Sequence, residues 1–195
     1  MKLNALAFNV TLATAGLLCA GGAHADGFTG DYAAGQWTTL NSNGGNGTVA
    51  ATASTLTLTS ADFTGSPDAT FESSLFSYFF TAVADTVVSF DWSYLTHDDN
   101  GSSYDTLNYT LGGQSFQLST DDSFDAQGGS VSALLVKAGS SFGYQMASLD
   151  SWGGSGVGTI TNFNAVAAVP EPASVALMLA GLGLVGAVVR RRQRD

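Results

Sequence analysis

Residues 86–96 read Thr-Val-Val-Ser-Phe-Asp-Trp-Ser-Tyr-Leu-Thr and carry the clearest secondary-structure signal in the chain. Large apolar residues alternate there with small or polar ones, and the apolar set is Val88, Phe90, Trp92 and Tyr94. Successive side chains of a strand point to opposite faces, so one face of this stretch is apolar and the other polar. The pattern predicts a central strand packed on a hydrophobic core.

Strand-like segments recur on both sides of residues 86–96, separated by clusters of Gly, Ser, Asn and Asp. The other predicted strands are Gln36–Leu40, Thr48–Thr59, Leu75–Ala82, Tyr104–Leu111, Gln114–Ser119, Ser130–Ala138, Ser141–Ser148 and Gly158–Val166. Gly112-Gly113 predicts a tight hairpin, and Val131, Ala133 and Leu135 are expected on one face of their strand. About nine short strands without a sustained helical period predict an all-β domain over residues 26–168, a two-sheet antiparallel β-sandwich of jelly-roll-like form.

The domain is strongly acidic. Between Asp26 and Val169 the chain has 14 acidic residues and a single basic one, Lys137, which gives a net charge of −13. Nucleic acid is excluded as a partner because its binding needs positive charge. Cations and neutral polysaccharides remain compatible with this surface.

The N-terminus has the features of a secretory signal peptide over residues 1–25. Lys2 precedes the apolar stretch Ala5–Leu18, and Ala23-His24-Ala25 fits the cleavage pattern of signal peptidase, with Ala23 and Ala25 as its small residues. We expect a signal helix here and a mature chain that begins at Asp26. Cys19 is the only cysteine, so the mature domain has no disulfide and must be held by its core or by a metal.

The C-terminus has three parts in order. Pro170-Glu171-Pro172 is followed by an apolar run, residues 173–189, and then by the basic residues Arg190, Arg191, Arg192 and Arg194. The run predicts a short transmembrane helix, and the arginines are expected to stay in the cytoplasm. A plain C-terminal membrane anchor is one interpretation of this arrangement.

Residues 169–195 resemble the PEP-CTERM sorting signal of Gram-negative envelope proteins. The resemblance implies an exosortase as processing enzyme, cleavage near Pro170-Glu171-Pro172, and a link to exopolysaccharide and biofilm. It also implies a location that is at first the inner membrane and then the cell surface or the extracellular matrix.

An acidic loop suggests a calcium site. Asp98, Asn100, Ser102 and Asp105 can present oxygen ligands at loosely regular spacing, and Ca²⁺ takes 6–8 oxygens. Further carboxylates are available at Asp121, Asp122, Asp125 and Asp150. The loop is not an EF-hand, because its glycine, Gly101, is the fourth residue counted from Asp98 and no Glu closes it. The alternative is a solvated acidic turn.

The remaining candidates concern sugars and catalysis. Trp152, between Ser151 and Gly153, is the best candidate for stacking on a sugar, with Trp37 and Tyr104 behind it; the alternative for each is a place in the core. His97 is the only histidine after signal cleavage, and no nucleophile–base arrangement can be assembled. The first functional hypothesis is therefore a non-enzymatic structural protein associated with exopolysaccharide. The second is a calcium-dependent carbohydrate-binding module, and the third is a glycosidase that uses an acid pair.

Overall fold

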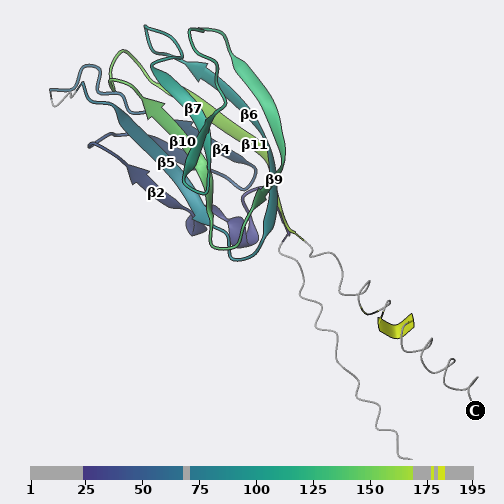
Figure 1. Ribbon diagram of the computed structural model, residues 1–195. Coiled ribbons are helices and arrows are strands. Elements are labelled where there is room, and N and C mark those ends of the chain that lie inside the picture. Colours follow the sequence, from purple (N-terminus) through teal and green to yellow (C-terminus); the bar gives the residue numbers. More distant parts are fainter. Residues whose placement is uncertain (1–23, 68–70, 169–176, 178–179, 183–195) are drawn as a thin grey trace, which may run out of the picture.

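The computed structural model describes residues 24–67, 71–168, 177 and 180–182. These residues form an all-β, two-sheet antiparallel sandwich (Figure 1), which confirms this part of the predicted fold class. Its strands are β1 (His24–Asp26), β2 (Thr38–Asn41), β3 (Thr48–Ala51), β4 (Thr55–Thr59), β5 (Ser74–Thr81), β6 (Thr86–Thr96), β7 (Asp105–Leu111), β8 (Gln114–Gln117), β9 (Gln127–Val136), β10 (Ser141–Ser148) and β11 (Gly156–Ala167). Two 3₁₀ turns, η1 (Gly30–Tyr32) and η2 (Ala34–Gln36), lie between β1 and β2.

The strands divide between two sheets. Sheet A has the order β3-β4-β11-β6-β9, and β1 also pairs with β11; sheet B has the order β2-β5-β10-β7-β8. Only β3–β4 and β7–β8 are consecutive strands within one sheet, so most connections cross between the sheets. The crossing connections bring loops from both sheets together at the ends of the sandwich.

The predicted central strand is β6, and it has the bounds expected from its alternation. It lies between β11 and β9, and its inward residues Val88, Phe90 and Tyr94 are at most 2% exposed. The side chains that face them from β10, namely Phe142, Tyr144 and Met146, are fully buried. Alternation was a sufficient signal here because both strands pack one face on the core.

Aromatic side chains close the core at one end. Trp37 stacks on Tyr78 with ring centroids 5.0 Å apart, and Phe28 stacks on Phe163 at 4.9 Å. The indole N–H of Trp37 donates to the Tyr32 carbonyl at 2.9 Å, and the residue is only 7% exposed. Trp37 is therefore a core residue, and this burial removes it as a candidate sugar platform.

The predicted strand Thr48–Thr59 is two strands, β3 and β4, joined by a turn. The Thr52 hydroxyl accepts hydrogen bonds from the N–H groups of Ser54 and Thr55, and the Thr52 N–H donates to the Thr55 carbonyl at 2.8 Å. A threonine side chain thus replaces the Gly or Pro that usually marks a turn. The uniform Thr and Ala composition gave no sign of it.

The expected face of β9 is wrong beyond its middle. Val88 pairs with Leu134 and Phe90 with Val131, so β9 has one extra residue there. Ala133 takes a left-handed backbone (φ 57°) at this β-bulge. The bulge reverses the alternation, and Leu135 is 44% exposed while Leu134 packs on the core.

The predicted terminal segments fall mostly outside the described residues. Outside them lie the signal helix, most of the helix expected at 173–189, and the residues Ala23, Pro170, Glu171, Pro172, Arg190, Arg191, Arg192 and Arg194. Ala25 is in β1 and pairs with Ala165. Leu177 and residues 180–182 have helical backbone. Within the described part of the chain, no helix has the length and apolar character needed to cross a bilayer.

Candidate functional site

The two ends of the sandwich differ in the length of their connections. The terminal end, where β1 meets the last residues of β11, has the turns 52–54, 82–85, 112–113 and 137–140. It also has the longer connection 27–37, whose aromatic side chains Phe28, Tyr32 and Trp37 are buried in the core. The opposite end, here called the loop end, has the connections 42–47, 60–73, 97–104, 118–126 and 149–155. Every loop-end connection is longer than every one of these turns. Binding residues concentrate on long loops held by a rigid scaffold, so the loop end is the candidate functional site.

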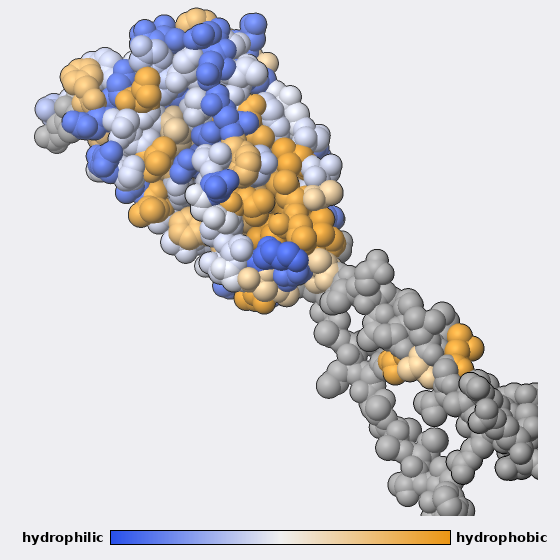
Figure 2. Space-filling model, viewed as in Figure 1, coloured by the Kyte–Doolittle hydropathy of each residue, from blue (hydrophilic) through white to orange (hydrophobic). Residues whose placement is uncertain are grey.

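Acidic residues concentrate at the loop end. Among the described residues, nine carboxylates belong to its connections or adjoin them: Asp62, Glu72, Asp98, Asp99, Asp105, Asp121, Asp122, Asp125 and Asp150. The terminal end has Asp26, Asp31 and Asp85. Figure 2 shows the same difference in hydropathy, with a mostly hydrophilic loop end and apolar residues gathered on the flank toward the terminal end.

Two of these carboxylates are buried. Asp105, the first residue of β7, is 0% exposed, and Asp98, in the loop after β6, is 2% exposed. Asp98 Oδ1 accepts the backbone N–H of Asn100 at 2.6 Å. Asp98 Oδ2 and both carboxylate oxygens of Asp105 have no hydrogen-bond partner. Buried polar atoms without partners are rare in folded proteins, so these three oxygens require an explanation.

Asp105 lies in a layer of buried polar groups between the core and the loops. Its side chain points into the sandwich, as does that of Leu107 two residues later on the same strand. The Tyr94 hydroxyl donates a hydrogen bond to the Asp105 backbone carbonyl. The hydroxyls of Ser60 and Ser148 are near its carboxylate without reaching hydrogen-bond geometry, and they lower its pKa. At this end of the sandwich, the aromatic core is therefore bounded by a layer of oxygen-bearing groups.

Burial dominates the electrostatics of this layer. It raises the pKa of Asp105 to about 7, and the charges of Asp98 and Asp150 act in the same direction. Burial also raises the pKa of Asp98, with Asp150 and Asp99 adding to the shift, while the Asn100 N–H lowers it. The protein therefore keeps two carboxyl groups in positions that disfavour their charged forms.

Glycines in the last loop allow it to lie against these carboxylates. A Cβ at Gly153 would be 3.1 Å from Asp98 Oδ2, and one at Gly156 would be 2.8 Å from Asp105 Cβ. Gly154 has φ 124°, and a Cβ there would be 2.1 Å from the His97 carbonyl oxygen. The connection 149–155 thus lies against Asp98, and Gly156, the first residue of β11, lies against Asp105.

The structure separates the predicted calcium ligands into two groups. Asp98 and Asp105 are the buried pair, whereas Asn100 is exposed. Ser102 is buried, but its hydroxyl donates to the Thr120 carbonyl at 2.6 Å and accepts the Ser123 N–H at 3.0 Å. Among the residues described, no three His, Cys, Asp or Glu side chains converge as a metal-binding group. Calcium binding by the full predicted set stays a prediction.

Three of the four added acidic candidates have hydrogen-bond partners of their own. Asp121 accepts from the Gln117 amide at 2.5 Å, and Asp122 accepts from the Ser103 hydroxyl at 2.6 Å. Asp150 accepts the Trp152 N–H at 3.1 Å. Asp125 is exposed. These contacts order the acidic loops and leave the orphaned oxygens at Asp98 and Asp105.

Trp152, the predicted sugar platform, lies in the same loop and forms an aromatic pair that the sequence did not reveal. Its ring is tilted against that of Phe71, with centroids 4.9 Å apart. Phe71 is 68% exposed and Trp152 is half-buried. Tyr104 is also half-buried. Phe71 lies 81 positions before Trp152 in the chain, so no local sequence pattern could predict that the two rings are in contact.

His97 is an exposed residue at the start of the loop after β6. Its Nδ1 is 3.3 Å from the Ser155 carbonyl, an arrangement in which the nitrogen donates. Asp98, the next residue, and Asp105 are closed off from solvent and so out of reach of a sugar substrate. An acid-pair mechanism at these two residues has no access for its substrate.

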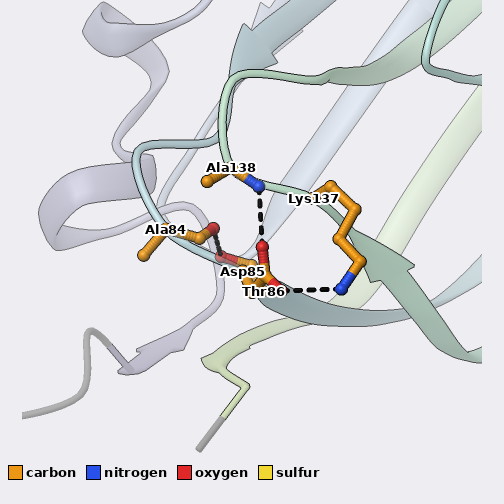
Figure 3. A network of polar contacts seen from close by, with 5 residues as sticks. All are labelled: Ala84, Asp85, Thr86, Lys137 and Ala138. Carbon is orange, nitrogen blue, oxygen red and sulfur yellow. Dashed lines mark hydrogen bonds and ion pairs between the residues drawn. The ribbon is translucent and has the colours of Figure 1, made fainter. Parts of the chain in front are cut away.

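At the terminal end, by contrast, the Asp85 carboxylate has hydrogen-bond partners for both of its oxygens. Asp85 accepts hydrogen bonds from Lys137 Nζ at 2.8 Å and from the Ala138 N–H at 2.9 Å (Figure 3). These bonds lower the pKa of Asp85, the Lys137 bond most. The Asp85 carbonyl also accepts the N–H of Ala168 at 2.7 Å. This network joins two turns and the end of the folded domain.

Comparison with known proteins identifies the segment that follows the sandwich. Residues 168–193 match the PEP-CTERM protein-sorting motif, which confirms the resemblance seen in the sequence. The motif implies export and processing by an exosortase. Curated proteins give no match to this chain.

The solved structures to which this chain is similar are remote. TmCBM61 in complex with β-1,4-galactotriose is 13% identical, with a TM-score of 0.35, and 68% of this chain covers 88% of it. A family 11 carbohydrate-binding module of the cellulase Lic26A-Cel5E of Clostridium thermocellum is 8% identical, with a TM-score of 0.38, and 77% of this chain covers 97% of it. The Podospora anserina GH26-CBM35 β-(1,4)-mannanase is 12% identical, with a TM-score of 0.26, and 70% of this chain covers 29% of it. Such scores give no information about what this chain binds.

Proposed function

We propose that this chain is an exported envelope protein whose sandwich is a non-enzymatic component of the cell surface or extracellular matrix, associated with exopolysaccharide. The observation that carries the proposal is the sorting motif at residues 168–193. It begins at Ala168, whose N–H is bonded to Asp85 at the terminal end. The long loops lie at the opposite end of the sandwich from Ala168, the first residue of the motif.

The charge of the loop end supports this arrangement. Nine carboxylates at one end repel an anionic membrane surface, and this repulsion favours an orientation with the loops outward. Lys137, the only Lys or Arg among the described residues, is at the terminal end and pairs with Asp85. An acidic, glycine-rich loop surface attracts cations and tolerates neutral polysaccharide.

The first experiment is the intact mass of the protein isolated from its host, with both termini mapped. We expect a chain that begins at Asp26 and ends near Pro170–Pro172. A variant with Pro170-Glu171-Pro172 replaced by alanines should stay unprocessed, while Asp195→Asn, outside the matched motif, should be processed normally. A native chain that still ends at Asp195 would contradict processing and leave a plain membrane anchor.

A second candidate function is carbohydrate binding, favoured by the pair of exposed Phe71 and half-buried Trp152 beside the acidic loops. Aromatic rings with an exposed face are suited to stacking on sugar rings. We expect host exopolysaccharide to co-sediment with the full chain in detergent and to be lost with Trp152→Ala. Phe124→Ala is the matched control, because Phe124 is 62% exposed at the same end. Equal loss in both variants, or in neither, would count against this pair as the site.

A further inference from the structure

The strongest unexplained feature of the molecule is the set of three orphaned oxygens at the loop end. Asp98 Oδ2, Asp105 Oδ1 and Asp105 Oδ2 are buried without a hydrogen-bond partner. A buried carboxylate is costly unless a proton, a hydrogen-bond donor or a cation compensates it. The site must therefore be neutralised by a group other than the neighbouring side chains.

No basic side chain is available for this task. Lys137 is the only Lys or Arg in the described part of the chain, and it pairs with Asp85 at the other end of the sandwich. His97 directs Nδ1 to the Ser155 carbonyl. The two carboxylates thus share a charge of up to −2 with no protein counter-charge beside them.

The groups around the two carboxylates are oxygen donors. The hydroxyls of Ser60 and Ser148 are close to Asp105, and the Tyr94 hydroxyl reaches the Asp105 carbonyl. Gly153 and Gly156 bring backbone close to Asp98 and Asp105. Hard cations prefer oxygen ligands, and an irregular set from loops suits Ca²⁺ better than Mg²⁺, which demands near-octahedral geometry.

We propose that Asp98 and Asp105 form a buried Ca²⁺ site that closes the loop end of the sandwich. Two carboxylates match the charge of one divalent cation, and neutral oxygens complete the coordination. The site uses two of the residues expected from the sequence and dispenses with Asn100 and Ser102. It is independent of glycan binding, since it lies beneath the loops and not on their surface.

The test is calorimetric titration of Ca²⁺ into the full chain in detergent at pH 8, after removal of metal with a chelator. We expect one stoichiometric site in the native sequence, weakened at least 100-fold in Asp98→Asn and in Asp105→Asn. Asp99→Asn and Asp121→Asn are matched controls at the same end and should keep the site. Circular dichroism establishes that each variant is folded.

Terbium luminescence gives a second measurement of binding that does not rely on the heat of binding. Tyr94 lies beside Asp105, so Tb³⁺ in the site should be sensitised by excitation of protein aromatics and displaced by Ca²⁺. Three outcomes would overturn the proposal: no stoichiometric site, binding unchanged in both buried-Asp variants, or equal weakening in the Asp99 and Asp121 controls. The last outcome would mean that the acidic loops attract cations diffusely. If a buried-Asp variant does not fold, terbium competition on the native chain still decides whether a specific site exists.

Discussion

The sandwich is closed differently at its two ends. At the terminal end, Phe28, Tyr32 and Trp37 pack on the core aromatics Phe80 and Phe163, with ring centroids 4.9–5.9 Å apart. At the loop end, the closure is a layer of hydroxyls and carboxylates beneath long loops. One end is sealed by apolar contact and the other by polar groups whose pairing is incomplete.

The carboxylates of the two ends also differ in how completely they are paired. Asp85 is half-exposed and has two donors, so its charge is well solvated and paired. Asp98 and Asp105 are buried and leave three oxygens unpaired. Polar groups that cost stability persist where they serve a function, which makes the loop end the more informative region.

Glycine substitutions should separate the ends most strongly. Gly154→Ala places a Cβ against the His97 carbonyl in a backbone conformation that L-residues avoid, and should cost at least about 3 kcal/mol of unfolding free energy. Gly113→Ala, in the β7–β8 hairpin, also has positive φ (83°) but meets nothing within 4 Å, and should cost only about 1 kcal/mol. Chemical denaturation measures both. Equal costs would mean that the loop over Asp98 is not tightly packed.

The pH dependence of stability sharpens the comparison next. The pKa of Asp105 is about 7 in the folded protein, above its ordinary value, so the folded state binds more protons than the unfolded state from about pH 4 to 7. Stability in chelator should therefore fall by roughly 2–3 kcal/mol between pH 5 and pH 8. Asp98 and Asp150 face Asp105 and act in the same direction.

Urea denaturation across this pH range makes the measurement, with and without Ca²⁺. Asp105→Asn should flatten the plot of unfolding free energy against pH, whereas Asp99→Asn should leave the slope of this plot unchanged. Saturating Ca²⁺ should restore stability at pH 8 if the cation replaces the proton, because a ligand that binds only the folded state stabilises it. A native curve that is flat or rises toward pH 8 would contradict the raised pKa.

The sequence predicted the parts of the fold that depend on one strand alone. The alternation of residues 86–96 and 141–148 gave the bounds of β6 and β10, because each strand packs one face on the core. It failed where a strand's neighbour sets the pattern. The bulge at Ala133 depends on pairing with β6, and the turn at Thr52 depends on a side-chain hydrogen bond.

The candidate site was predicted only in part, because a local sequence pattern does not show which distant segments lie against a residue. Asp98 and Asp105 stood out as oxygen-bearing loop residues, but burial depends on the 149–155 loop, which no local pattern connects to them. The network at Asp85 depends on Lys137, 52 residues further on. The pairing of Trp152 with Phe71 is equally remote in sequence. The sorting motif matched at residues 168–193 was predicted because it is a local sequence signal.

Tyr144 provides a comparison with the orphaned carboxylates from inside the apolar part of the core. Its hydroxyl is buried and has no partner, and burial raises its pKa well above the ordinary value. Tyr144→Phe removes this unpaired group and keeps the ring, which packs on Phe90 at 5.0 Å. We expect the variant to be more stable by about 1 kcal/mol, as measured by urea denaturation. A loss of stability would reveal a partner for the hydroxyl.

The ion pair at the terminal end should have the smallest effect. Lys137→Met keeps the aliphatic stem and removes the charge, while Asp85 still accepts the Ala138 N–H and remains in contact with water. Surface ion pairs contribute little to stability and are screened by salt. The free energy of unfolding should therefore change only slightly in Lys137→Met, and less at 1 M NaCl than at low salt. Asp85→Asn weakens both contacts and should cost more than Lys137→Met. If Lys137→Met instead destabilised the domain as much as Gly154→Ala, the terminal end would depend on its ion pair, and the aromatic closure would not be sufficient to hold it.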